Sequence, residues 1–337
     1  MKTLPGHPIK TFTDENAEAK RMIRKMRSGA KAAARELKTD DFSQQIIELK
    51  KIDLHYLRKE NLLFPMLEAA SFTGPSKVMW GKHDEIRSHF KELRTALEEK
   101  NRRGILSNWA VLSRSIKRMT FMEERILFPT ALKLLSDRQW AEIRKSESEL
   151  GYAWIQPGNL WDSNIVIARS RADELGKPIV APVDSAAAAS ASASAPASAT
   201  ASEQGEIPLD VGAMTPTMLN LLLKNLPLDI TYVDENDKVR YYSQGRERLF
   251  PRTPAIIGRD VQNCHPPRSV HIVEKIVDDF RNKREDTAEF WLNMGGKFIH
   301  IRYFALYDTE GAYRGVLEVS QDVTGIRGLE GEKRLLD

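Results

Sequence analysis

The chain of 337 residues is long enough for two separate cores, and its 41% hydrophobic and 29% charged residues describe an ordinary globular protein. Its net charge of +4 is small, and basic residues alternate with acidic ones, which argues against a stripe that binds nucleic acid. The apolar runs are too short to cross a membrane, no signal peptide is apparent, and the single cysteine, Cys264, excludes an internal disulfide. We therefore expect a cytoplasmic protein that engages neither membrane nor nucleic acid.

Residues 8–150 carry apolar side chains at helical spacing, separated by short polar breaks. The expected helices begin at Pro8 and then cover about 41–69, 77–100, 105–134 and, as a short addition, 136–149. Short connections between long amphipathic helices favour an antiparallel, up-down four-helix bundle. The fourth helix should turn Leu112, Met119, Glu123 and Ile126 toward the core.

A phrase that ends in Leu-Phe-Pro occurs twice in this region, at 55–65 and at 119–129. Each copy has a carboxylate shortly before the Leu-Phe-Pro, Glu60 in the first and Glu123 in the second, near the apolar face of its helix. A buried carboxylate is unstable unless it is paired, hydrogen-bonded or bound to a metal. The repeat therefore predicts polar ligands in the middle of the bundle.

The chain then changes in composition. In residues 151–184 the side chains of Trp154 and Trp161 are expected to pack on the bundle, although Gly and Pro interrupt any regular pattern. Residues 185–206 are rich in Ala and Ser and are expected to form a flexible linker. This organisation predicts a bundle at 1–150, a second domain at 207–328 and a tail at 329–337.

The second domain is expected to be α+β with an antiparallel sheet. A short helix at 218–226 precedes a strand, a turn and a strand in 229–242, and a helical middle section includes 270–282. Strands are expected at 287–294, 297–307 and 313–323, and the Gly295-Gly296 pair between the first two is a strong hairpin signal.

The first domain resembles the hemerythrin-like, HHE cation-binding family in Gly6-His7-Pro8, in the two Leu-Phe-Pro copies and in the stretch Met79–Arg87. The second domain resembles a PAS sensor domain in Ile230–Asn236, in Ile257-Gly258-Arg259 with the following His265-Pro266, and in Asp322-Val323-Thr324. Together they resemble bacterial proteins in which a hemerythrin-like domain is fused to a PAS domain.

The hemerythrin-like resemblance implies a non-haem iron site with one or two ions. The candidate metal ligands are His7, Glu15, His55, Glu60, His83 and Glu123. Four positions depart from the family pattern: Lys10, Lys59, Arg87 and Met119 stand at or near places where the family has ligands. A five-histidine site that carries oxygen is therefore not expected.

Helical geometry places Glu15, His55, Glu60, His83 and Glu123 in or beside the apolar arcs of their helices. Two histidines and three carboxylates suit iron or manganese better than copper. Lys59 lies near the centre of the same arc, however, and its ammonium could neutralise a glutamate without any ion. The residues alone leave a metal site and a buried Lys/Glu/His network both open.

In the PAS-like domain, Cys264, His265 and His271 are candidates for a haem or metal ligand, and the competing interpretation is a helix entry with exposed polar groups. No PAS ligand can be named. The expected function is a sensor, without catalytic activity, whose iron responds to oxygen, nitric oxide or redox state. Its output is expected to pass through a PAS homodimer or an unidentified downstream protein. The alternatives are a di-iron oxidase or iron storage and repair protein, and a metal-free interaction scaffold.

Overall fold

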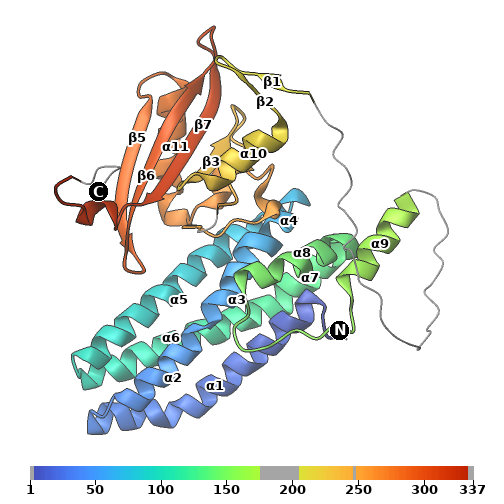
Figure 1. Ribbon diagram of the computed structural model, residues 1–337. Coiled ribbons are helices and arrows are strands. Elements are labelled where there is room, and N and C mark those ends of the chain that lie inside the picture. The colour runs from blue at the N-terminus through green and yellow to red at the C-terminus, as the bar shows by residue number, and fades with distance from the viewer. Residues whose placement is uncertain (1–3, 175–204, 246–247, 333–337) are drawn as a thin grey trace, which may run out of the picture.

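The computed structural model describes residues 4–174, 205–245 and 248–332 (Figure 1). All but the last two residues of the expected linker 185–206 therefore lie outside the described residues. The N-terminal part of the chain is a bundle of long helices, and the C-terminal domain contains a twisted sheet with helices beside it. The helical part consists of α1 (Pro8–Glu36), α2 (Asp40–Lys50), α3 (Ile52–Arg58), η1 (Lys59–Leu63), α4 (Phe64–Ala69), α5 (Gly74–Glu98), α6 (Arg102–Met122), η2 (Glu123–Leu127), α7 (Phe128–Leu134), α8 (Asp137–Leu150) and α9 (Ser163–Glu174).

The inward faces predicted from helical spacing form the core of the bundle. Phe12, Ala19, Ile23 and Met26 of α1 are buried in the same cluster as Ile86 of α5. The same cluster contains Leu112 and Met119 from α6, so each long helix contributes one apolar stripe. The expected bundle is confirmed, and α8 adds a further helix to it through the buried ring of Trp140.

The second and fourth predicted helices are not continuous, because each contains a π-helical turn just before its proline. Pro65 and Pro129 carry no N–H, and the ring of a proline clashes with the carbonyl group four residues earlier in an α-helix. The chain relieves this clash with the wider turns η1 and η2, in which Phe64 N–H bonds Lys59 O and Phe128 N–H bonds Glu123 O. The extra residue rotates the helix phase, so Ile126, which was expected inside, is 54% exposed.

The segment after the bundle follows its surface. The indole N–H of Trp154 donates to the carbonyl oxygen of Glu48 at 3.1 Å, and Trp161 N–H donates to Pro5 O at 2.9 Å. Both rings pack against the bundle core, as the sequence predicted. The helix α9 was not predicted, because its sequence has no strong apolar periodicity.

The C-terminal domain is built on an antiparallel sheet of order β4-β3-β7-β6-β5 in the described residues. Its strands are β3 (Asp229–Val233), β4 (Val239–Tyr242), β5 (Thr287–Met294), β6 (Lys297–Tyr307) and β7 (Tyr313–Asp322), which confirms the predicted strands to within a residue. A short ribbon of β1 (Ile207–Pro208) and β2 (Ala213–Met214) leads into α10 (Pro216–Asn225). The remaining helices are η3 (Pro254–Ile256), η4 (Val261–Cys264), α11 (Pro267–Arg281) and η5 (Ile326–Gly328).

The hairpin between β5 and β6 turns at the two glycines, which have φ angles of 61° and 84°. A two-residue turn with both φ angles positive matches the twist of the flanking strands, and this requirement explains Gly295-Gly296. Met294 then faces Lys297 as the last pair of the ladder. The helix α11 packs on the sheet through Val277 and Phe280, which are buried in the core of this domain.

The two domains touch at one end of the bundle. There η3 and α11 of the C-terminal domain lie against η1, α4 and α5, as Figure 1 shows for the loops beside α4. Nowhere in the described ranges is a helix both long and apolar enough to cross a bilayer.

Candidate functional site

Nine charged or ionisable side chains meet in the interior of the bundle, and we name them the buried charge cluster. Its members come from six elements and, except for the partly exposed Arg87, are at most 2% exposed. They are Glu15 on α1, His55 and Arg58 on α3, Lys59 and Glu60 on η1, His83 and Arg87 on α5, Glu123 on η2 and Glu147 on α8.

Lys59 lies at the centre of this cluster. Its ammonium donates to a carboxylate oxygen of Glu123 and to Nε2 of His83, the latter at 2.9 Å. The π-turn aims the side chain inward, and the Lys59 Nζ atom lies 4.7 Å from the centre of the Tyr56 ring. Burial alone would raise the pKa of Glu123, but Lys59 and His55 outweigh it and hold that pKa well below its usual value.

His83 connects Lys59 to the edge of the cluster. Because Nε2 faces an ammonium, it must accept, and Nδ1–H then donates to Glu60 Oε1 at 2.7 Å. Burial and the neighbouring Lys59 lower the pKa of His83, which favours this neutral imidazole. Arg87 in turn donates to both carboxylate oxygens of Glu60 at 3.1 Å, although burial still raises the pKa of Glu60.

His55 lies between two carboxylates on the other side of Lys59. Its Nδ1 is 2.9 Å from Glu15 Oε2 and its Nε2 is 3.1 Å from Glu123 Oε2. A doubly protonated ring would donate to both carboxylates, whereas each neutral tautomer donates to one of them. Asn16 donates to the same oxygen of Glu123 at 2.7 Å. The carboxylate of Glu123 is thus surrounded by donors.

Arg58 and Glu147 extend the cluster toward α8 and were missed by the sequence reasoning. Arg58 donates to Glu15 and, at 3.1 Å, to Glu147, with its guanidinium 4.9 Å from the centre of the Phe12 ring. Burial outweighs these arginine contacts and raises the pKa of Glu147 to about 7. A usable signal existed, because Glu147 lies four residues after the inward-facing Ile143 on an amphipathic helix.

The structure therefore gathers five of the predicted ligand candidates, Glu15, His55, Glu60, His83 and Glu123. The sixth, His7, is placed differently. It caps the N-terminus of α1, where its Nδ1 accepts from Ile9 N–H at 3.2 Å, and its ring packs on Trp140 and Trp161. A ring nitrogen that is used for a helix cap is not turned toward the cluster.

The atoms that would bind a metal already have partners. Glu123 bonds Lys59, His55 and Asn16, and the Nε2 of His83 faces the ammonium of Lys59. Among the residues that the structure describes, no three His, Cys, Asp or Glu side chains are arranged to hold a metal ion. As arranged, the donor set fits an internal ammonium and does not fit iron.

Comparison with known families assigns both domains. Residues 7–131 match the hemerythrin HHE cation-binding domain, and residues 219–324 match a PAS domain. The chain joins a hemerythrin HHE domain to a PAS domain. The recognition made from sequence motifs is thereby confirmed, as is the multidomain fold class.

Solved structures with similarity to the chain include a C-terminal domain from Streptococcus mutans, 34% identical, covering 38% of this chain and 99% of that one, with a TM-score of 0.37. A PAS domain from Colwellia psychrerythraea is 18% identical, and the match covers 32% of this chain and 97% of that domain, with a TM-score of 0.26. The PAS domain of BvgS from Bordetella pertussis is 16% identical, and the match covers 32% of this chain and 85% of that domain, with a TM-score of 0.27. No curated protein matches the chain.

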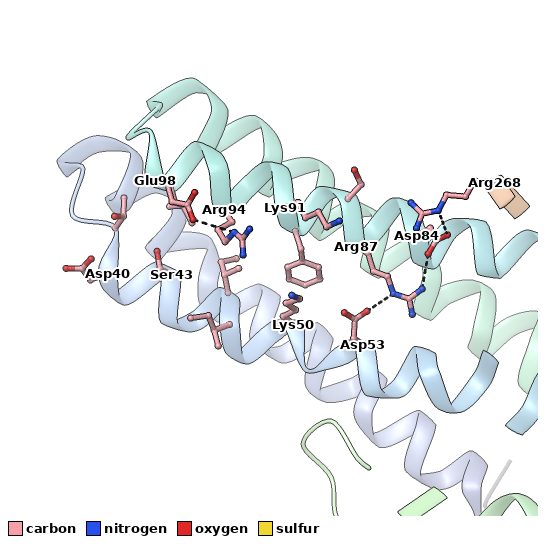
Figure 2. A pocket seen from close by; sticks show the side chains of 16 residues that line it. Asp40, Ser43, Lys50, Asp53, Asp84, Arg87, Lys91, Arg94, Glu98 and Arg268 are labelled. Carbon is pink, nitrogen blue, oxygen red and sulfur yellow. Dashed lines mark hydrogen bonds and ion pairs between the residues drawn. The ribbon is translucent and has the colours of Figure 1, made fainter. Parts of the chain in front are cut away.

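The hemerythrin HHE domain opens to solvent near its buried charge cluster. A groove of about 650 Å³ runs between α2 and α5, and Figure 2 shows Arg87 at one end of it. There Arg87 donates to Asp53 and Asp84 at 3.0 Å each while it also holds Glu60. Arg87 therefore separates the groove from the interior.

In the PAS domain the three ligand candidates lie in different surroundings. Cys264 is half-buried and its thiol is 3.6 Å from the carbonyl oxygen of Asp260, while burial raises its pKa. His265 lines a small cleft beside Trp80 of the bundle, and burial lowers its pKa to about 4. His271 is exposed on α11. This arrangement favours the helix-entry interpretation of His265-Pro266.

Proposed function

We propose that this chain is a regulatory protein in which a metal-free hemerythrin-like bundle serves as the structural partner of a PAS sensing domain. One observation carries the proposal: Lys59 Nζ lies within hydrogen-bonding distance of both Glu123 and His83. These are two of the side chains that the family pattern would assign to a metal, one from η2 and one from α5. The ammonium supplies from within the chain the positive charge that a bound cation would otherwise supply.

An internal cation changes what the bundle can do. Lys59, Arg58 and Arg87 neutralise carboxylates in the interior without any ligand, so the helices are held together in the absence of metal. Breaking one of these pairs leaves a buried charge unpaired, which is strongly destabilising. The bundle is therefore suited to keeping one arrangement of helices until its PAS partner changes. This function is close to the metal-free interaction scaffold, which was an alternative expectation from the sequence.

The rival function is an iron-containing sensor that responds to oxygen, nitric oxide or redox state. It is supported by the family match and by the five gathered ligand candidates. A di-iron oxidase, or an iron storage or repair protein, would need the same ion. In each case the ammonium of Lys59 would have to move away from Glu123 and His83, because a metal ion would bind the same carboxylate and imidazole atoms.

Metal analysis of the full chain tests the proposal. Protein is purified anaerobically, incubated with Fe(II), desalted and assayed for iron and manganese, and we expect far less than one ion per chain. Retention of one or two ions per chain after desalting would overturn the proposal and favour the iron sensor. Oxygen consumption with turnover would then separate an oxidase from a sensor.

A double variant and its control test whether Lys59 and Met119 are the residues that prevent metal binding. Lys59→Glu with Met119→His restores a carboxylate and an imidazole at the departing positions, and this double variant is expected to retain iron. The matched control is Lys50→Glu with Met122→His, which makes the same changes at an exposed and a partly exposed position of α2 and α6. We expect the control to remain as metal-poor as the unmodified chain.

Output through a PAS homodimer or a downstream protein remains part of the proposal. It is supported by apolar side chains on the PAS surface, such as Leu221 of α10, which is 56% exposed, and Trp291 of β5, which is 63% exposed. Sedimentation of the full chain over a range of concentrations measures whether two copies associate.

A further inference from the structure

The first Leu-Phe-Pro turn lacks a backbone donor for the carbonyl groups that precede its proline. Pro65 has no N–H, so it cannot donate to Asn61 O in an α-helical pattern or to Glu60 O in the π pattern of η1. Buried carbonyl groups are almost always paired. The residues concerned carry or adjoin the buried charge cluster, since Glu60 bonds His83 and Arg87.

The PAS domain supplies donors to these two carbonyl groups. The hydroxyl group of Thr253, just before η3, donates to Asn61 O at 2.8 Å. The guanidinium of Arg259 donates to Glu60 O at 3.3 Å. Thr253 is fully buried and Arg259 is 7% exposed, so water cannot readily replace either donor.

Arg259 is fixed in place by the bundle itself. It forms a two-pronged ion pair with Glu68 of α4, with distances of 2.7 and 2.9 Å, and its guanidinium lies 5.6 Å from the centre of the Trp80 ring. Both side chains of the pair are at most 7% exposed. A paired, planar contact of this kind fixes orientation as well as charge.

The second copy of the motif differs from the first in its exposure. In η2 the residues Arg125 and Ile126, which precede Pro129, are exposed, so solvent reaches that turn. The PAS domain therefore covers the copy that carries Lys59 and Glu60.

We propose that docking of the PAS domain holds the π-turn Lys59–Leu63 in register, so that Thr253 and Arg259 act as positioning residues for Lys59 and Glu60. A change in the PAS domain that moves η3 or η4 would release the turn and loosen the buried charge cluster. By reciprocity, loosening the cluster would weaken docking. This coupling goes beyond the proposed function and holds whether or not the bundle takes up a metal.

A second, weaker connection runs in parallel. Arg268 of α11 reaches to within 3.8 Å of Asp84, which is bonded to Arg87 (Figure 2). Arg87 in turn bonds Glu60. Arg268 is 78% exposed on its side chain, and exposed ion pairs contribute little. The buried contacts of Thr253 and Arg259 therefore dominate the coupling.

Hydrogen exchange of the full chain tests this coupling from the PAS side. Arg259→Gln is expected to speed amide exchange in 57–68 by about tenfold, as the loss of a hydrogen bond from a charged group would. The conservative Thr253→Val should do the same to a lesser degree. The matched control is Arg284→Gln, which removes an exposed PAS arginine that is paired with Asp278 and Asp279, and it should leave 57–68 unchanged.

The reverse experiment separates coupling from simple loss of cover. Lys59→Met lies inside the bundle, yet it should speed exchange in 253–262 of the PAS domain. Its control, Ile105→Ala, makes a buried cavity near the far end of α6, about 27 Å along the helix from Glu123, and should leave 253–262 unchanged. Unchanged exchange in 57–68 for Arg259→Gln and Thr253→Val, or in 253–262 for a folded Lys59→Met, would overturn the coupling. Neither measurement depends on metal content, so the proposed function can fail separately.

Discussion

Lys59 and Glu123 form an ion pair in the interior of the bundle, and neither side chain has any exposed surface. They come from the two copies of the same motif, and each is carried by a π-helical turn. Their pairing joins the second and fourth predicted helices of the bundle at the place where the family pattern would put a metal ion.

Removing the ammonium should strongly destabilise the bundle. Lys59→Met leaves Glu123 buried beside His55 and Asn16 with less positive charge, and the expected loss is about 3–5 kcal/mol in the free energy of unfolding. Urea denaturation followed by circular dichroism measures it. Combining Lys59→Met with Glu123→Gln should recover much of the loss, because the unpaired charge is then gone.

The matched control for this loss is the ion pair of Glu124, the residue that follows Glu123. Lys20 pairs with Glu124 at 2.7 Å, but both side chains are about a third exposed. Lys20→Met should therefore change the free energy of unfolding by less than about 1 kcal/mol. Equal effects of Lys20→Met and Lys59→Met would mean that burial of the Lys59 pair contributes nothing.

Glu147 should give the bundle a characteristic pH dependence. Its pKa is raised from near 4.5 to about 7, so the folded state holds a proton that the unfolded state releases. Stability from this group is therefore greatest below pH 4.5 and falls as pH rises toward 7, by at most about 3 kcal/mol. His7 and His265, whose pKa values are lowered to about 4, act in the opposite direction.

The comparison that isolates Glu147 is with Glu147→Gln, measured by urea denaturation at several pH values. The variant should gain stability relative to the unmodified chain as pH rises from about 4.5 to 7. Glu142→Gln changes an exposed glutamate on the same helix and should show no such trend. A constant difference across this range would contradict the raised pKa of Glu147.

Much of the bundle could be predicted from sequence because helical spacing fixes which face of a helix is buried. The same spacing brought Glu15, His55, Glu60, His83 and Glu123 together. Spacing cannot say where the end of a long side chain lies, so the choice between an ammonium and a metal at Lys59 stayed open. His7 was assigned to the metal, although Pro8 at the first helical position indicates that His7 is a cap.

Other features were beyond the reach of periodicity. Each π-turn shifts the helical periodicity by one residue, and this shift places Ile126 on the outer face of its helix. In the sequence, only Pro129 indicates the shift, because its ring does not fit a regular α-helical turn. The contact of Thr253 with Asn61 joins residues 192 positions apart. Such a contact depends on how two domains dock, and no local pattern encodes it.

Strand pairing in the PAS domain should depend on one glycine. Gly315 has a φ angle of 121°, and a Cβ atom there would lie 2.0 Å from the carbonyl oxygen of Val233. Gly315→Ala must therefore separate β3 from β7, and we expect a loss of at least about 3 kcal/mol in the stability of this domain. Gly296→Ala, which has a φ angle of 84° but open space around it, should lose about 1–2 kcal/mol. Thermal unfolding that ranks the two variants equally would contradict the close approach.

Thermal stability in the presence of Fe(II) gives a test of metal binding that does not rely on retained metal. Any ligand that binds only the folded state raises the unfolding midpoint, and it does so more as its concentration exceeds the dissociation constant. Because Lys59 occupies Glu123 and His83, anaerobic Fe(II) should leave the midpoint of the unmodified chain unchanged. In Lys59→Glu with Met119→His the ammonium is gone and two ligands are added, so the midpoint should rise with Fe(II). A rise in the unmodified chain alone would mean that Lys59 yields its place to the metal.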